Sequence, residues 1–301
     1  NDDDTLGGVS RRAALLKARR AIREKDGATL TLDAGDFMMG SLFHTLNGEE
    51  AFELRLLSYM KYDAITLGNH DFEWGPDGLA KMIEAALRLG SIPKIVAANT
   101  ELSASDQRDD RLATLFDQGH IEKSTVITKG SLTFGIFGLI GEHAVEVTKT
   151  AAPLVFSSAI EAAQKQVQLL KQNKVDVVIA LSHSGVWFEN GQWGFEDVEL
   201  AKAVPQIDII VSGHSHQLVK EPIIVGKTII VQAGALGKYL GELTVQRKDH
   251  GDLKVTDYEL HILDDKVKGD EETMDEVAQM GATIEQKILA PRCFTFDEAV
   301  V

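Results

Sequence analysis

The sequence has no pair of cysteines for a disulfide bond, no membrane-spanning apolar run and no signal-peptide pattern. Cys293 is the only cysteine among 301 residues, so no intrachain disulfide can form. No apolar run reaches the ~18 residues that are needed to span a bilayer. The chain begins Asn1-Asp2-Asp3-Asp4, without an initiating Met or a signal-peptide pattern. We therefore expect a processed or trimmed product from which any targeting segment has been removed.

Basic residues are also fewer than acidic residues. The chain has 31 Lys and Arg against 46 Asp and Glu, and its formal net charge is −15. A field of this sign repels duplex DNA, which argues against non-specific nucleic-acid binding. A small phosphorylated substrate remains compatible, because a bound metal ion reverses the local sign. The composition, 44% hydrophobic and 26% charged, is typical of a globular protein.

Strand-length apolar runs alternate with amphipathic, helix-length patterns along most of the chain. Strands are predicted at residues 28–32, 63–67, 94–98, 121–128, 132–140, 175–181, 207–211, 222–225, 228–233, 240–246 and 253–263. Helices are predicted at residues 11–25, 49–62, 76–89, 157–173, 195–204 and 271–289. Lys129-Gly130 indicates a hairpin turn, and the acidic stretch 100–119 indicates a loop outside the core. This order predicts an α/β fold with two facing sheets and helices outside.

Potential metal ligands follow four of the predicted strands. They are Asp36, Asn69-His70-Asp71, His183, and the pair His214 and His216. Parallel strands of an α/β sheet present their carboxyl ends at one edge, where ligand sites lie. In extended backbone the two imidazoles of Gly213-His214-Ser215-His216 would point to the same side, as neighbouring ligands should. We therefore expect these side chains to form one site.

The candidate ligands offer nitrogen and oxygen but no thiolate. Such a set suits Mn, Fe, Zn, Ni or Co and fits poorly with a structural zinc site. A carboxylate that can bridge, together with several imidazoles, is what a two-metal hydrolytic centre needs. There, two ions ~3.5–4 Å apart hold a hydroxide and the phosphoryl oxygens for in-line attack.

The ordered motifs resemble those of the calcineurin-like metallophosphoesterases. The motifs are Leu32-Asp33-Ala34-Gly35-Asp36, Gly68-Asn69-His70-Asp71, Ser182-His183-Ser184-Gly185 and Gly213-His214-Ser215-His216. The extensions that resemble the 5′-nucleotidase/UDP-sugar hydrolase branch are Gly40-Ser41, Phe72-Glu73-Trp74-Gly75, Gln232-Ala233-Gly234 and Leu240-Gly241-Glu242-Leu243. The resemblance spans roughly residues 7–263.

The resemblance implies a four-layer α/β/β/α sandwich of two facing mixed sheets and a centre of two divalent ions. Asp36 would bridge both ions, and Asn69, His183 and His214 would complete one site, while His216 would bind the other ion. His70, oriented by Asp71, would stabilise the transition state or protonate the leaving oxygen. Asn69, and His143 after the strand 132–140, are candidate substrate-binding residues.

The sequence departs from the family pattern at both ends. The family's opening Asp-x-His motif is missing, and Asp2 is the one candidate remnant of it. Either a segment is missing from the chain or the second metal site is incomplete. We favour the former, because losing the first strand of a central sheet would cost the core heavily. We expect residues 1–265 to form the catalytic domain and 266–301 a linker helix and tail, without the C-terminal nucleotide-specificity domain.

Three functions are compatible with these motifs. The leading one is a metal-dependent phosphoesterase that acts on nucleotides or similar small phosphoesters. The alternatives are a thiosulfohydrolase of the sulfur-oxidation type and a non-catalytic metal- and phosphate-binding module. The resemblance also implies a periplasmic or extracellular location. For Trp187, Phe188 and Trp193, packing within their own loop is favoured over covering the substrate.

Overall fold

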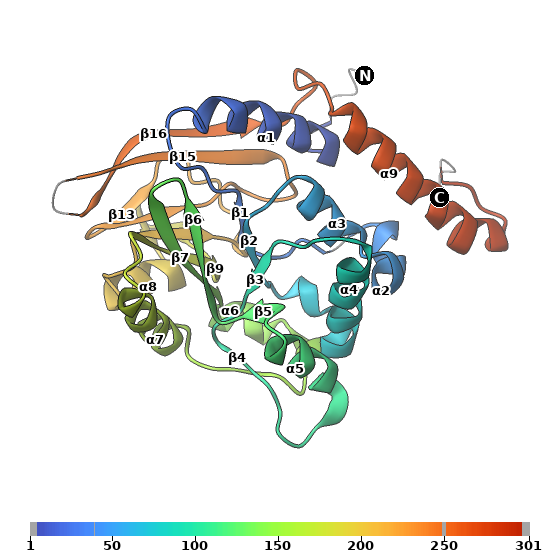
Figure 1. Ribbon diagram of the computed structural model, residues 1–301, viewed down its shortest axis with the longest axis horizontal. Helices are drawn as coiled ribbons and strands as arrows, with labels where there is room; N and C mark the ends of the chain where they lie inside the picture. The colour runs from blue at the N-terminus through green and yellow to red at the C-terminus, as the bar shows by residue number, and fades with distance from the viewer. Residues whose placement is uncertain (1–4, 39, 249–250, 297–301) are drawn as a thin grey trace.

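Two sheets form the centre of the protein in a computed structural model that describes residues 5–38, 40–248 and 251–296 (Figure 1). The first sheet has the strand order β1-β2-β3-β5 and is parallel throughout its described strands. Its strands are β1 (Leu32–Asp33), β2 (Ala64–Thr66), β3 (Lys94–Val96) and β5 (Ile121–Glu122).

The second sheet has six strands in the order β13-β14-β12-β9-β7-β6. They are β13 (Ile223–Val225), β14 (Thr228–Val231), β12 (Ile209–Ser212), β9 (Val177–His183), β7 (Leu132–Ile140) and β6 (Ser124–Lys129). The central strands are parallel, whereas β13 and β6 pair antiparallel at the two edges. The hairpin predicted at Lys129-Gly130 is confirmed, since Lys129 pairs with Leu132.

The two sheets pack face to face through apolar side chains. Ala64 and Val96 of the first sheet share a buried cluster with Ile136 and Ile179 of the second. At Gly138 in β7 the sheets approach so closely that a Cβ atom would lie 2.0 Å from the carbonyl oxygen of Val96. Glycine is therefore required at this contact.

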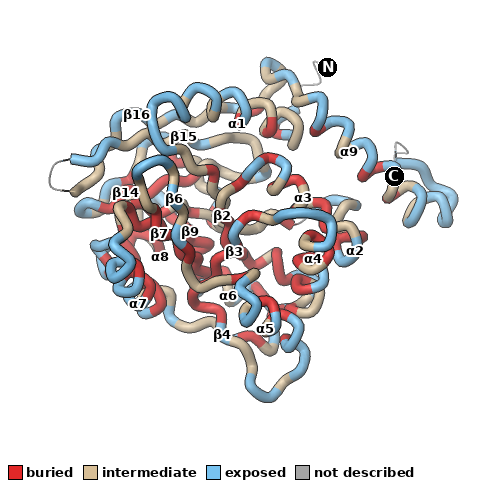
Figure 2. The backbone as a smooth tube through the Cα atoms, in the orientation of Figure 1, coloured by how far each residue is buried: buried red, intermediate tan, exposed pale blue. Residues whose placement is uncertain are grey.

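Helices cover the outer face of each sheet, which confirms the four-layer α/β/β/α architecture (Figure 1). The first sheet is covered by α3 (Phe52–Tyr59), α4 (Gly75–Leu89) and α5 (Asp110–Asp117), and the second by α7 (Ala159–Gln172) and α8 (Glu196–Ala203). Figure 2 shows the buried residues concentrated in the strands and on the inner sides of these helices. No helix in the described ranges has the length and apolar character required to traverse a bilayer.

An antiparallel hairpin, β15 (Tyr239–Arg247) with β16 (Leu253–Ile262), lies beside α1 (Val9–Arg23). The Glu242 carboxylate joins the two elements. It accepts hydrogen bonds from Arg19, with Nε at 2.7 Å, and from Arg23. These charges, with His261, lower the pKa of Glu242 to about 2.

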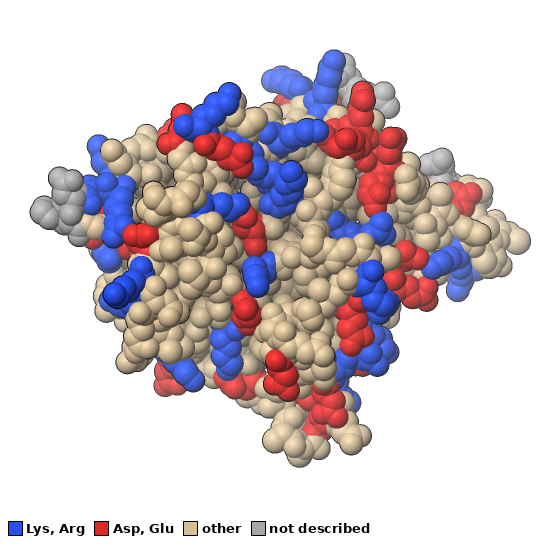
Figure 3. All heavy atoms as spheres, in the orientation of Figure 1, with Lys and Arg blue, Asp and Glu red and all other residues tan. Residues whose placement is uncertain are grey.

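The helix α9 (Glu271–Ile284) follows the hairpin and continues as a wider turn over Glu285–Leu289. Its Met280 and Ile284 are buried in the core cluster of the first sheet, and Glu276 pairs with Arg55 of α3. Acidic side chains gather over its first turn (Figure 3), as suits the positive end of a helix dipole. The division into residues 1–265 and 266–301 stays a prediction.

The stretch 100–119, predicted as a loop, is more ordered than expected. It contains β4 (Thr100–Glu101), which pairs with β8 (Val155–Phe156), and the helix α5. Leu112 and Leu115 of α5 are buried in the core. The loop prediction was wrong because this stretch is rich in charged residues, and the helix within it has only one narrow apolar face.

Candidate metal centre

The ligands predicted from the strand ends meet between the two sheets. Asp36 and Asn69 follow β1 and β2 of the first sheet, whereas His183 ends β9 and His214 follows β12 of the second. The Nε2 atom of His183 lies 3.0 Å from Oδ2 of Asp36 and 3.1 Å from Oδ1 of Asn69. The Nδ1 atom of His214 lies 3.0 Å from the same Asn69 oxygen. Thus both sheets contribute ligands to one point.

The chemistry of these atoms fits a cation. His183 Nδ1 lies 2.7 Å from the carbonyl oxygen of Ala34, which can only accept, so Nδ1 carries the proton. In the neutral ring Nε2 then offers a lone pair, and it faces the oxygens of Asp36 and Asn69. Asp36, His183 and His214 each supply one ligand atom within 4.8 Å of the others. Such a convergence of ligand atoms is suited to a bound cation.

The two imidazoles differ in the direction of their pKa shifts. Burial by itself would lower the pKa of His183, but the hydrogen bond and charge of Asp36 raise it, so this position favours positive charge. Burial, followed by the charge of His183, lowers the pKa of His214 to about 4. His214 is therefore neutral near pH 7 and has a lone pair available for a metal.

Backbone geometry makes room for the cluster. A Cβ atom at Gly68 would lie 2.2 Å from Oδ1 of Asp36 and 2.6 Å from Cε1 of His183. Asp36 and His214 adopt left-handed φ values of 60° and 65°. Non-glycine residues seldom adopt this conformation, and at these two positions it sets the direction of the ligand side chains.

Asp71 has a different role from the one predicted. Its buried carboxylate accepts backbone hydrogen bonds from Gly68 at 2.7 Å, Asp36 at 2.9 Å and Met38 at 3.2 Å. Burial and the charge of Asp36 raise its pKa well above the ordinary value. Asp71 therefore ties together the two loops that carry Asp36 and Asn69.

The prediction that Asp71 orients His70 was wrong, because the partner of the His70 ring is Glu73. The Nδ1 atom of His70 lies 2.7 Å from Oε1 of Glu73, within a 3₁₀ turn that begins at His70. The ring lines the cavity described below. Sequence reasoning missed Glu73, although residues three apart in a helical turn share one side and this spacing could have indicated it.

The two remaining histidines of the prediction are placed differently. His216 lines the cavity but is not part of the three-residue ligand cluster found among the described residues. Both His214 and His216 have left-handed backbone, and Ser215 N donates to Gly213 O, so the expected extended geometry was wrong. His143 contacts one of the ligands, since its Nδ1 atom lies 2.8 Å from Nε2 of His214. Asp2 falls outside the described residues.

A cavity of about 840 Å³ is lined by several of the ligands and by residues of both sheets. Asp36, His70, His183, His214 and His216 contribute polar atoms to its wall. Its apolar part is lined by residues of the β1 segment, the second sheet and β15, among them Leu30, Leu32, Ile179, Ile209, Leu243 and Val245. Four of the predicted ligands, Asp36, His183, His214 and His216, therefore share one concave site with apolar surface, as small-molecule sites commonly do.

A buried polar network behind the ligands was not foreseen. Asp197 of α8 accepts from Ser182 Oγ at 2.6 Å and from Gly185 N at 3.1 Å, on either side of His183. Gln232 accepts from Ser215 Oγ at 3.0 Å and donates to the carbonyl of Gly213 at 3.1 Å, on either side of His214. These bonds hold the two imidazole loops. Asp197 lies outside the motifs, so spacing offered no signal for it.

Comparison with known proteins places this geometry in a family. The family profile of the calcineurin-like phosphoesterases matches residues 6–218. A 5′-nucleotidase of Mus musculus is 34% identical over 84% of this chain and 43% of its own length. An apyrase of Aedes albopictus is 31% identical over 89% of this chain and 48% of its own length. The chain thus spans about half the length of these curated relatives.

A solved structure supports the same assignment. A 5′-nucleotidase precursor from Thermus thermophilus matches with a TM-score of 0.77 and 27% identity, over 94% of this chain and 54% of that chain. The predicted resemblance to the 5′-nucleotidase branch is confirmed, as is the predicted class, a hydrolase of phosphoric esters, at the level of the family. The chain belongs to the calcineurin-like phosphoesterase family.

Proposed function

We propose that the protein hydrolyses small phosphate monoesters, with nucleotide 5′-phosphates as the leading substrate class, in a metal-dependent reaction. The observation that carries the proposal is the convergence of Asp36, Asn69, His183 and His214 beside a cavity that His70 also lines. The substrate class rests on the 5′-nucleotidases and the apyrase among the relatives.

Asp36, Asn69, His183 and His214 would hold a divalent cation, and His216 together with Asp36 would contribute to a second one. Bound divalent cations would polarise the phosphoryl group and lower the pKa of the attacking water. Other groups of the protein orient these candidate metal ligands. The carbonyl oxygen of Ala34 orients His183, and Asp71 connects the loops that carry Asp36 and Asn69. Little reorganisation is then needed when substrate binds.

His70 is the proposed catalytic residue among the side chains. Glu73 accepts a hydrogen bond from Nδ1 of His70 and orients the ring, so Nε2 is the atom that can donate to a phosphoryl oxygen or to the leaving oxygen. The ring is 30% exposed, which leaves it accessible from the cavity. Its backbone N–H donates to Oδ1 of Asp36 at 2.8 Å, which fixes the ring beside the ligand cluster.

We further propose that the protein acts outside the cytoplasm, in the periplasm or the extracellular space. This proposal rests on the resemblance and on relatives such as the snake venom 5′-nucleotidase of Gloydius brevicauda, which is 30% identical over 92% of this chain. Cell fractionation of a host that expresses the full-length gene would test it.

The test of function is hydrolysis of p-nitrophenyl phosphate, bis-p-nitrophenyl phosphate and AMP with added Mn²⁺. We expect metal-dependent turnover that is lost in an Asn69→Ala/His70→Ala double variant. A His120→Ala variant, which changes a histidine outside the cavity lining, should keep its activity and serves as the control. Bound metal without turnover of any of the three esters would contradict the proposal and favour the thiosulfohydrolase or the non-catalytic binder.

A further inference from the structure

The two ring nitrogens of His214 have different neighbours. Nδ1 lies 3.0 Å from Oδ1 of Asn69, on the side of the candidate ligands, whereas Nε2 lies 2.8 Å from Nδ1 of His143. A neutral imidazole presents a lone pair on one nitrogen and carries its proton on the other. If Nδ1 of His214 binds a cation, Nε2 therefore carries the proton, and Nδ1 of His143 is placed to accept the hydrogen bond from it.

His183 has the same arrangement with a different acceptor. Its Nδ1 donates to the carbonyl oxygen of Ala34 at 2.7 Å, and its Nε2 faces Asp36 and Asn69. The acceptor for His183 is thus a backbone atom, which a substitution does not remove. The acceptor for His214 is the side chain of His143, so this support can be removed and restored by substitution.

His143 is held in place through its backbone and through its ring. The carboxylate of Glu196, in the first turn of α8, accepts the backbone N–H groups of Glu142 at 2.8 Å and His143 at 2.9 Å. The ring of Phe195 contacts that of His143, with centroids 5.8 Å apart. The ring of Trp187 in turn contacts that of Phe195 edge to face, with centroids 6.1 Å apart. These contacts fix the direction in which Nδ1 of His143 points.

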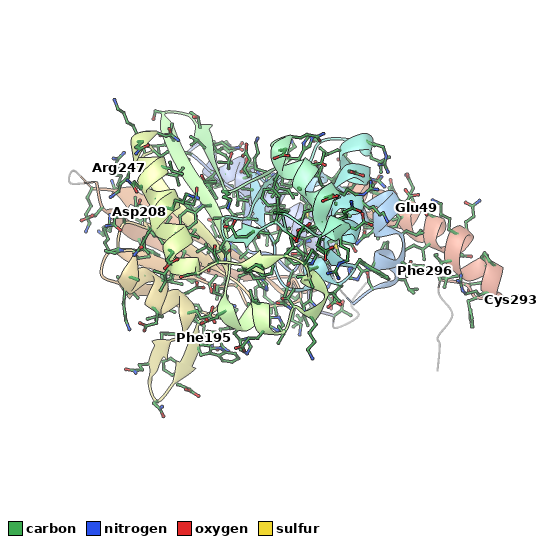
Figure 4. The ribbon with its side chains drawn as sticks, turned by 90° about the horizontal axis from the view of Figure 1, so that it is seen from below. Glu49, Phe195, Asp208, Arg247, Cys293 and Phe296 are labelled. Carbon is green, nitrogen blue, oxygen red and sulfur yellow. The ribbon has the colours of Figure 1, made fainter. Side chains whose placement is uncertain are left out.

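The hairpin that precedes Phe195 supplies this aromatic support. It consists of β10 (Trp187–Glu189) and β11 (Gln192–Gly194), which pair antiparallel. The ring of Phe188 contacts that of Trp193, with centroids 5.1 Å apart, which confirms the packing predicted within this loop. Figure 4 shows the hairpin projecting from the body of the molecule, with Phe195 at its base.

We propose that His143 is a positioning residue for the metal centre: it accepts the hydrogen bond of Nε2–H of His214 and so keeps Nδ1 of that ring directed at the bound cation. This inference rests on the proposed function and adds to it a residue that lies outside the four motifs. Among the described residues that line the cavity, His143 does not appear, so its effect passes through His214. Such partners of a ligating imidazole fix its tautomer and its ring direction.

The test is Mn²⁺ binding measured by equilibrium dialysis, and the ion of interest is the one lost in His214→Ala. His143→Phe keeps a ring beside Phe195 but has no acceptor, so the dissociation constant of this ion should rise about 10- to 100-fold. His143→Ala should show the same loss. His143→Asn should restore most of the affinity, because its side-chain oxygen is as many bonds from Cβ as Nδ1 is. Val147→Ala, at the exposed end of the same short helix, is the control and should bind as wild type does.

Wild-type affinity in His143→Phe would overturn the inference. An equal loss in His143→Phe and His143→Asn would also overturn it, because the acceptor would then be irrelevant. Failure of the proposed function is distinguishable: wild-type protein would bind Mn²⁺ without hydrolysing p-nitrophenyl phosphate, and dialysis of the variants would still decide the role of His143. Absence of Mn²⁺ binding by the wild type would overturn both proposals.

Discussion

At the scale of single residues, the candidate site depends on small features beside the ligands. Gly68 has no side chain where Asp36 and His183 approach each other, and a Cβ atom there would overlap both. The carboxylate of Asp71 binds three backbone N–H groups, and that of Glu73 binds the ring of His70. Residues that themselves bind neither metal nor substrate therefore set the directions of those that would.

Gly68→Ala should disable the site without unfolding the protein. The added methyl group would displace Asp36 or His183, and a misplacement of about 1 Å costs catalysis about 10²-fold. We expect a loss of this size in kcat/KM and weaker Mn²⁺ binding by equilibrium dialysis. Gly27→Ala is the control, because no atom lies within 4 Å of the position that its added methyl group would take. Wild-type metal affinity in Gly68→Ala would show that the loops relax freely.

At the scale of elements, α8 is connected to the loop at the end of β9 by the buried carboxyl group of Asp197. Asp197 lies in the first turn of α8 and accepts hydrogen bonds from both sides of the His183 position. Burial raises the pKa of Asp197 to about 7. The folded protein therefore keeps this proton at pH values where the unfolded chain has lost it.

This difference predicts a pH dependence of stability. Between about pH 4 and about pH 7 the folded state binds more protons at Asp197 than the unfolded state, so its stabilising contribution is complete below pH 4 and falls as the pH rises. Relative to Asp197→Asn, the wild-type free energy of unfolding should fall by up to about 4 kcal/mol across this window. Urea denaturation at several pH values measures it. Parallel pH curves for the two proteins would contradict the assigned pKa.

At the scale of the whole molecule, the centre joins the two sheets. The first sheet contributes Asp36 and Asn69, and the second contributes His183 and His214. Separating the sheets would separate the ligands, so a bound cation stabilises the folded state and has little affinity for the unfolded chain.

Divalent metal should therefore raise the melting temperature. At a free Mn²⁺ concentration 100 times Kd the gain is about 2.7 kcal/mol, which corresponds to a shift of several degrees in a protein of this size. Differential scanning calorimetry with Mn²⁺ and with EDTA measures the shift. His183→Ala removes one ligand and should abolish most of it. An equal shift in that variant would mean that Mn²⁺ binds elsewhere.

Much of the fold and of the site was predictable from the sequence. The alternation of strands and helices, the hairpin at Lys129-Gly130 and the four-layer sandwich follow from local periodicity and the ordered motifs. The meeting of Asp36, Asn69, His183 and His214 follows as well, because parallel strands bring their carboxyl ends to one edge and facing sheets bring two such edges together. The sequence by itself thus determined the family and the centre of the site.

Only the tertiary structure decided which groups support those ligands. The Glu73 partner of His70, the contact of His143 with His214 and the left-handed turns at His214 and His216 depend on loop paths and ring directions, which periodicity does not encode. Contacts between distant segments determine these features, and no local pattern specifies them.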